Sequence, residues 1–234
     1  MKTLIQYHTD KFIQSLTSAI TNSFISNIDG VLYSLHFQND FDSIVFVVSD
    51  KISAEVNNFI IEFQEQKNIV LYYTETSEDY SELFKHAKHV TKHGGPPLKQ
   101  KHIELPEVIV NTSIFVDQKL EQKRDKYCII LNYVKNLPDE LKCLLYPNTK
   151  IPINMFNSPY VAHTQNLGMI NSELEKSNIL NKYKYFVNIS SEYVYEAALC
   201  GCKVVHIDCD GKITDMPVDT NKIVPIIDII KEIL

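Results

Sequence analysis

Short apolar runs alternate with amphipathic segments through the first half of the chain. Four of these runs are apolar enough for buried strands, namely Thr3–Tyr7, Ile44–Val48, Ile69–Tyr73 and Val108–Asn111. Between them, apolar residues at helical spacing predict helices over Asp10–Ile25, from Ser53 through Phe63, and over Ser77–His89. A strand that alternates with a helix in this way predicts a parallel sheet between two layers of helices.

The alternation resumes after a charged stretch. Between Phe115 and Tyr127 the chain reads DQKLEQKRDK, which contributes little to a hydrophobic core and predicts a domain boundary. The elements expected after it are a strand at Tyr127–Val134, a helix at Pro138–Leu145, a strand at Ile151–Phe156 and a last helix at Ile223–Leu234. We therefore expect an α/β protein of two Rossmann-like domains with parallel sheets, residues 1–122 and 123–234.

One strand–helix–strand segment stands out, and it reads YKYFVNISSEYVYEAALCGCKVVHID from Tyr183 to Asp208. Tyr185–Ile189 and Val204–Ile207 are predicted as buried strands. Ser190 and Ser191 are natural N-cap residues for the helix between them, and Gly201 suits the C′ position that ends it. The crossover is just long enough for a right-handed βαβ unit.

The start of this helix carries two carboxylates. Glu192 and Glu196 are four positions apart, which places them on one helical face near the positive end of the dipole. Acidic residues are favoured in any first turn, so this position alone is also compatible with a structural role. Backbone N–H groups at a helix start attract phosphate, and a nearby carboxylate accepts both hydroxyls of a ribose. A nucleotide diphosphate carries both phosphate and ribose, so it can bind the N–H groups and the carboxylate together.

The pattern Ser-x-Glu…Glu-Ala-x-x-x-Gly-x-x-Val-Val resembles the sugar-nucleotide loop in the C-terminal domain of GT-B glycosyltransferases. Upstream, Asn166-Leu167-Gly168 and Asn171-Ser172-Glu173-Leu174 resemble a second segment of that family, so the match runs from about residue 151 to residue 208. The resemblance implies a GT-B-like fold with an acceptor-side N-terminal domain, and a last helix that packs back across the domain interface. It further implies a nucleotide-diphosphate sugar as donor and a glycan or other hydroxyl compound as acceptor.

The resemblance also assigns residues. Glu196 is expected to bind the ribose, and Glu192 to face the sugar or the diphosphate. Ser190 and Ser191 belong to the same nucleotide-binding loop. Lys135, in the loop after the first strand of the second domain, occupies the neighbourhood from which the family draws a diphosphate contact.

His8 is a candidate catalytic base. It follows the first strand directly, at the carboxyl edge where open α/β sheets bind ligands. A histidine there can accept a proton from an acceptor hydroxyl, although a lone histidine at a strand end is commonly structural. Asp10 can orient this ring or cap the helix that follows, and we favour the cap.

Two patterns raise the possibility of a metal. Asp208-Cys209-Asp210-Gly211 matches a D-x-D motif, but Asp and Gly also serve the backbone geometry of turns. His86, His89 and His93 have helical spacing, but no cysteine or carboxylate lies at a suitable separation, which favours a solvated face. We therefore expect no metal site, and a reaction that requires no cofactor beyond the donor substrate.

Composition narrows the class of protein. The chain has 234 residues, of which 44% are hydrophobic, and its net charge of −6 argues against nucleic acid as a partner. No run of about 18 apolar residues predicts a transmembrane segment, and no secretory signal is recognised, so we expect a cytoplasmic protein. The five cysteines have no zinc-type spacing and are expected to be reduced and buried.

The favoured function is a glycosyltransferase that moves a sugar from a nucleotide-diphosphate donor to an acceptor hydroxyl without a metal. Two alternatives stay open. Arg124 is the only arginine and the basic diphosphate pair of the family is not recognised, which is compatible with a catalytically silent GT-B-like binding or assembly protein. A nucleotide-sugar epimerase of similar fold is the other alternative.

Overall fold

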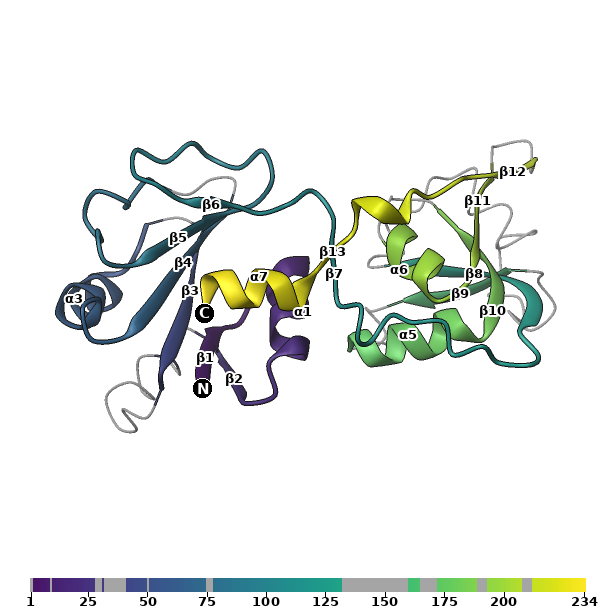
Figure 1. The fold of residues 1–234 in the computed structure, drawn as a ribbon, viewed down its shortest axis with the longest axis horizontal. Coiled ribbons are helices and arrows are strands. Elements are labelled where there is room, and N and C mark those ends of the chain that lie inside the picture. The colour runs from purple at the N-terminus through teal and green to yellow at the C-terminus, as the bar shows by residue number, and fades with distance from the viewer. Residues whose placement is uncertain are drawn as a thin grey trace, which may run out of the picture. The chain divides into compact units, whose positions relative to one another are not determined.

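The computed structural model describes residues 2–8, 10–27, 31, 41–49, 51–74, 78–131, 160–164, 172–188, 193–207 and 212–234. The chain divides into two compact units, and Figure 1 shows their helices and strands. Unit 1 comprises residues 1–111 together with 224–234, and unit 2 comprises residues 112–223.

Unit 1 is built on a six-stranded sheet in the order β2-β1-β3-β4-β5-β6, and all of its strands are parallel. Its strands are β1 (Thr3–Gln6), β2 (Ser23–Ser26), β3 (Ser43–Val48), β4 (Asn68–Tyr73), β5 (Lys88–Thr91) and β6 (Ile103–Glu104). The strand order reverses direction between β1 and β3, which is the topological switch point of a doubly wound sheet.

Helices cover both faces of this sheet, as Figure 1 shows. On one face, α1 (Lys11–Ala19) and α7 (Ile226–Ile233) pack on a core that includes Ile5, Val45 and Val70. On the other face, α3 (Ala54–Phe63) packs on a core that includes Leu4, Phe46 and Leu71. Successive residues of a strand point to opposite faces, so each central strand supplies both cores. The expected parallel sheet between two helical layers is therefore confirmed for unit 1, which is Rossmann-like.

Two side chains define the helix starts that the sequence predicts. The Asp10 carboxylate accepts the Phe12 backbone N–H at 2.8 Å, and Ser53 Oγ accepts the Val56 backbone N–H at 3.4 Å. Each bond satisfies one of the backbone donors that the first turn of a helix leaves unpaired. The predicted cap at Asp10 is thus confirmed, and its carboxylate is engaged by α1.

Two predicted helices of unit 1 are wrong in part. The first was expected to reach Ile25, but α1 ends at Ala19 and residues Ser23–Ser26 form the edge strand β2. The helix expected over Ser77–His89 is absent from its described residues, where turns lead into the strand β5. In both places a strand gains backbone hydrogen bonds from a neighbour that a local apolar pattern does not reveal.

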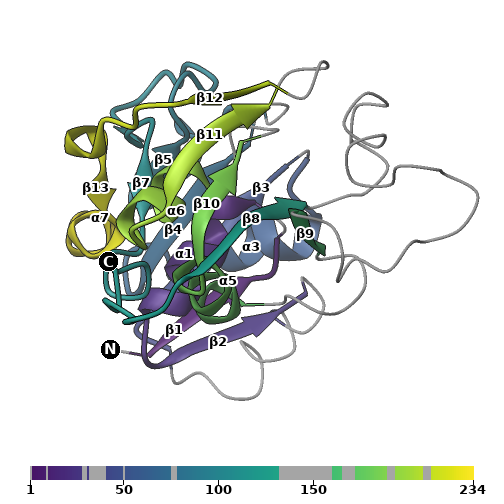
Figure 2. The ribbon, with the colours of Figure 1, turned by 90° about the vertical axis from the view of Figure 1, so that its right-hand side faces the viewer.

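Unit 2 repeats the strand order of unit 1. Its sheet has the order β12-β11-β10-β8-β9, so the second strand in sequence lies outside the first, and Figure 2 faces this sheet. The strands are β8 (Arg124–Leu131), β9 (Tyr160–Thr164), β10 (Tyr183–Val187), β11 (Lys203–Ile207) and the antiparallel β12 (Ile213–Asp215). The helices α5 (Glu173–Asn181) and α6 (Val194–Leu199) precede β10 and β11 respectively. The switch point of this unit lies between β8 and β10, which are neighbouring parallel strands.

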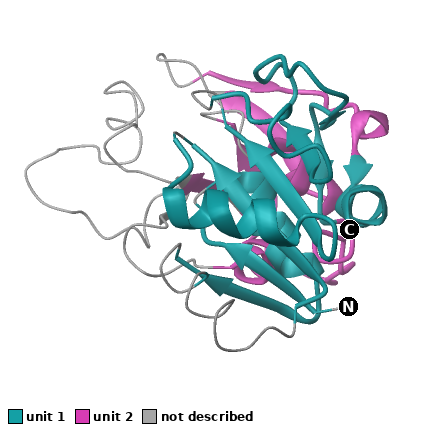
Figure 3. Ribbon diagram, turned by 90° about the vertical axis from the view of Figure 1, so that its left-hand side faces the viewer, with its two compact units in different colours: residues 1–111, 224–234 teal, residues 112–223 magenta. Residues whose placement is uncertain are grey.

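The chain returns to unit 1 at its C-terminal end, and Figure 3 shows both termini in that unit. After the 3-10 helix η4 (Thr220–Lys222), the short strand β13 (Val224–Pro225) pairs in parallel with β7 (Ile109–Val110). Four isoleucines of α7 then pack in the core beside α1, namely Ile226, Ile229, Ile230 and Ile233. The last helix, which the predicted boundaries placed in the second domain, therefore belongs to unit 1.

The charged segment that was expected to mark the domain boundary instead belongs to unit 2, whose first residue is Thr112. Ser177 Oγ of α5 donates to the Ile114 carbonyl at 2.7 Å. Asn181 of α5 donates to the Val116 carbonyl at 3.1 Å and accepts the Gln118 backbone N–H at 2.9 Å. Polar side chains therefore attach this segment through its backbone, although it adds little apolar surface.

Within the described ranges, no helix is both long enough and apolar enough to cross a membrane.

Candidate functional site

The strand–helix–strand segment expected to bind a nucleotide is present as β10, α6 and β11. β10 and β11 are parallel neighbours, with Phe186 opposite Val204. Gly201 follows the C-cap of α6 at a φ of +74°, a conformation that L side chains rarely adopt. Its N–H donates to the Ala198 carbonyl at 3.0 Å, and the Cys202 N–H donates to the Ala197 carbonyl at 2.9 Å. This pair of bonds is a Schellman motif, and it confirms Gly201 as the residue that ends the helix.

Gly201 also lies against two charged side chains of unit 2. A Cβ atom added to Gly201 would lie 2.5 Å from a carboxylate oxygen of Asp117 and 2.8 Å from Lys123 Nζ. Lys123 pairs with Asp117 at 3.2 Å and donates to the Cys200 carbonyl. The Lys119 backbone N–H, followed by the Lys123 ammonium, lowers the pKa of Asp117. Only glycine leaves room for this ion pair beside the helix end.

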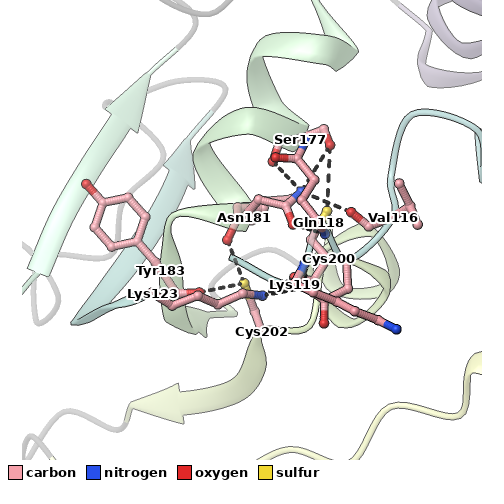
Figure 4. A network of polar contacts seen from close by, with 11 residues as sticks. Val116, Gln118, Lys119, Lys123, Ser177, Asn181, Tyr183, Cys200 and Cys202 are labelled. Carbon is pink, nitrogen blue, oxygen red and sulfur yellow. Dashed lines mark hydrogen bonds and ion pairs between the residues drawn. The ribbon is translucent and has the colours of Figure 1, made fainter. Parts of the chain in front are cut away.

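Figure 4 shows how these contacts join a wider network on α5. Asn181 and Ser177 face the segment that carries Val116 and Gln118, and Cys200 lies beside Ser177 with 3.8 Å between Sγ and Oγ. The end of α6 and the segment before β8 are thus both attached to α5. This network fixes the end of α6 relative to α5.

The start of α6 differs from the sequence prediction. The helix begins at Val194, and its N-cap is Tyr193, which adopts a left-handed backbone conformation with a φ of 62°. Ser190, Ser191 and Glu192, the predicted cap and loop residues, lie outside the described residues. The helical i,i+4 relation predicted between Glu192 and Glu196 therefore falls outside the described part of α6.

A buried lysine supports Tyr193. Lys176 of α5 is 1% exposed, and its Nζ lies 4.7 Å from the centroid of the Tyr193 ring. The same ammonium donates to the Tyr193 hydroxyl at 2.9 Å. A left-handed conformation costs a residue with a Cβ roughly 1–2 kcal/mol, and these contacts offset that cost. The sequence did not reveal this contact, because Lys176 lies in a polar stretch that is typical of a solvent-exposed helix.

Glu196 lies in the first turn of α6 and is 1% exposed. A carboxylate in that position is costly to bury unless other groups solvate it. Glu196 thus lies in the first turn of the helix that follows β10, as expected from the sequence, and its carboxylate is buried there.

The two strands that precede the segments expected to bind the diphosphate are parallel neighbours. β8 ends at Leu131 and β10 ends at Val187, and these parallel neighbours deliver the chain to the same edge of the sheet. This edge is the switch point of unit 2. Lys135 follows β8 in the sequence and lies outside the described residues, as does the loop after Asn188.

His8 lies in unit 1, directly beyond β1, as expected from the sequence. It is half-buried, and its Nδ1 accepts the Asp10 backbone N–H at 3.1 Å. The switch point of this unit lies between β1 and β3, so His8 stands at the corresponding edge of the first sheet.

The described cysteines behave as predicted, as buried thiols. Burial raises the pKa of Cys200 to about 11 and that of Cys202 to about 12, and it also raises the pKa of Cys128. Thiols of this kind are protonated at neutral pH and are poor nucleophiles. Cys143 and Cys209 lie outside the described residues.

No group of three or more His, Cys, Asp or Glu side chains that could hold a metal occurs among the described residues. Asp208 and Asp210 of the D-x-D pattern are not among them. His89 is on β5, where its Nε2 donates to the Phe84 carbonyl at 2.9 Å and its Nδ1 accepts the Tyr73 hydroxyl at 2.8 Å. The histidine is therefore a buried structural residue.

Comparison of the chain with protein families, with curated proteins and with solved structures finds no match.

Proposed function

We propose that this protein is a GT-B-like glycosyltransferase, in which unit 2 binds a nucleotide-diphosphate sugar and unit 1 receives a hydroxyl acceptor. The observation that carries the proposal is the β10–α6–β11 unit, which combines a parallel crossover, a buried carboxylate after the first strand and a glycine-closed helix. These are the parts that the sequence pattern of that family requires.

Two further observations support it. Both units have the doubly wound strand order with a switch point, which is the place where such sheets bind nucleotides and other small ligands. The chain also ends with a helix in unit 1 after passing through unit 2. A two-domain transferase of this family is organised in the same way.

The roles of the residues are those that the family resemblance assigns. Glu196 accepts the ribose hydroxyls, while Ser190, Ser191 and Glu192 continue the same loop toward the diphosphate and the sugar. Lys135, which follows β8 in the sequence, neutralises charge on the departing diphosphate. The transfer needs no resident metal, because the lysine and backbone N–H groups take the part of the cation.

The test is a thermal-shift series with UDP, GDP, CMP, ADP and their sugars, each with and without Mn²⁺. A ligand at 100 times its Kd stabilises the folded state by about 2.7 kcal/mol, which is roughly 5–10 °C for a chain of this size. Stabilisation by one nucleoside diphosphate regardless of metal is expected. A response that requires Mn²⁺ would move the site to Asp208 and Asp210, and a flat series would support the silent binding protein instead.

Glu196→Gln separates a ribose ligand from a structural carboxylate. A hydrogen bond to a charged group contributes about 1.5–3 kcal/mol, so loss of the charge is expected to weaken nucleotide binding roughly 10- to 100-fold. If the carboxylate is structural, the substitution should instead lower the melting temperature of the ligand-free protein and leave the ligand-induced shift unchanged. The exposed Glu121→Gln in the same unit is the charge-matched control.

Turnover distinguishes the transferase from the epimerase. A transferase releases the nucleoside diphosphate faster when an acceptor is present, whereas an epimerase converts one nucleotide sugar into another with no acceptor. Lys135→Ala is expected to reduce release of the diphosphate more than binding, because the lysine acts on charge that develops as the bond breaks.

A further inference from the structure

His8 stands where β1 leaves its neighbour β3. The two strands pair from Thr3 opposite Ser43 to Ile5 opposite Val45. Beyond that point the Val47 backbone N–H is taken by the side-chain Oε1 of Gln6 at 3.0 Å. The backbone ladder between these strands thus gives way to side-chain contacts just before His8, at the switch point of unit 1.

The contacts of His8 assign its tautomer. The Asp10 backbone N–H donates to His8 Nδ1 at 3.1 Å, so Nδ1 must carry a lone pair. A neutral imidazole has one nitrogen that accepts and one that donates. The N–H hydrogen of the neutral ring is therefore on Nε2, which can donate it to a partner other than Asp10.

This arrangement is the reverse of the one that a general base needs. A histidine base donates its Nδ1–H to a carboxylate or carbonyl group, and this leaves the lone pair on Nε2 for the proton of the substrate. Here the Asp10 carboxylate accepts the Phe12 backbone N–H at 2.8 Å to cap α1. The backbone N–H of the same residue points at Nδ1. The helix cap and the histidine tautomer are therefore set together.

We propose that His8 acts as a neutral hydrogen-bond donor, with Nε2–H directed to a hydroxyl or phosphate oxygen of the bound substrate, and not as the base of the reaction. The inference rests on the proposed function and changes one part of it, because the proton of the acceptor hydroxyl then goes elsewhere than to His8. In this role the neutral ring polarises an oxygen without taking up a proton, as neutral imidazoles beside helix starts do in other enzymes.

The tautomer can be tested without any substrate. Long-range ¹H–¹⁵N correlation spectra of the ¹⁵N-labelled protein distinguish a protonated Nε2 from a protonated Nδ1, and H8Q identifies the signals of this ring by their loss. Protonation on Nε2 at neutral pH is expected. Protonation on Nδ1 would overturn the inference.

The role can be tested by two substitutions at the same position. Glutamine carries an N–H₂ donor near the place of Nε2 but cannot act as a base, whereas alanine removes both functions. Release of UDP from UDP-glucose, or of GDP from GDP-mannose, is expected to fall roughly 10-fold or less in H8A, as for loss of one neutral hydrogen bond. H8Q is expected to recover most of that loss.

A base gives a different result. Loss of general-base catalysis costs about 10²–10⁴-fold, and H8Q would then be as slow as H8A. The control is H86Q, at a histidine of the same unit whose side chain is 59% exposed. If the wild-type protein releases no nucleotide from any sugar nucleotide of the thermal-shift series, the proposed function fails, and the nitrogen spectra alone decide the state of His8.

Discussion

Asn181 is the side chain whose loss should most directly detach the segment before β8 from unit 2. It is 0% exposed and lies at the end of α5. Its amide donates to the Val116 carbonyl at 3.1 Å and to the Ser177 carbonyl at 3.0 Å. Its carbonyl oxygen accepts the Gln118 backbone N–H at 2.9 Å. Asn181→Ala removes all three bonds at once.

The cost of this substitution follows from the surroundings of the bonded groups. Each bond contributes about 1 kcal/mol net, and Val116 and Gln118 have exposed side chains, so water can reach their backbone once the segment moves. Because the bond to the Ser177 carbonyl lies within α5, only the other two bonds hold the segment. We therefore expect a loss of about 2 kcal/mol against local opening, without the larger penalty of groups left buried and unpaired. At about 1.4 kcal/mol for each factor of ten, the Gln118 amide should exchange its hydrogen roughly 30-fold faster.

Hydrogen exchange followed by mass spectrometry on peptides that cover residues 114–123 measures this directly. Asn58→Ala, at an exposed asparagine of α3 in unit 1, is the matched control and should leave those peptides unchanged. Exchange of the Gln118 amide within about threefold of the wild-type rate in Asn181→Ala would refute the reasoning, since the segment would then be held by contacts other than this side chain.

Two other predictions concern stability. Gly201→Ala should lower the stability of unit 2 by about 2–4 kcal/mol in urea, because it adds a left-handed backbone cost of about 1–2 kcal/mol to displacement of Asp117 and Lys123. Gly94→Ala, at a φ of +64° with nothing within 4 Å of the added Cβ, should show the backbone cost alone, and equal losses would contradict the packing argument. Burial lowers the pKa of His89, so the unfolded chain takes up this proton at a higher pH than the folded protein does. The contribution of the neutral His89 to the stability of the fold is therefore complete above about pH 6.5 and is lost as the pH falls. Urea unfolding midpoints measured from pH 8 to pH 5 should show this loss. The apolar pair Tyr73→Phe with His89→Leu should flatten that dependence.

Local patterns were sufficient for the central strands and for several helix ends. β3 and β4 read as continuous apolar runs because both faces of each strand are buried, and β10 and β11 have enough of this character to be recognised. The caps at Asp10 and Ser53 and the stop at Gly201 were also predicted, since a cap depends on residues within one turn of the helix end. At the candidate site, the same local logic identified Glu196 and its place after β10.

Long-range partners decided the rest. The apolar residues of β2 fit a helix until β1 supplies a ladder for them, and the lysine and histidine positions of β5 fit a solvated helix until β4 pairs with them. Lys176 reads as a surface residue, and only the fold places it beneath Tyr193.

The unit to which a segment belongs also depends on the tertiary structure. The charged segment before β8 and the apolar helix α7 were each identified from the sequence. Only the fold shows that Asn181 attaches the charged segment to unit 2 and that α7 packs beside α1 in unit 1. The sequence by itself determined the central strands, several helix ends and the identity of the chemical groups, because those depend on neighbours along the chain. The tertiary structure alone decided the neighbours of each group and the nitrogen of His8 that carries its hydrogen, because these depend on hydrogen bonds made only when the chain is folded.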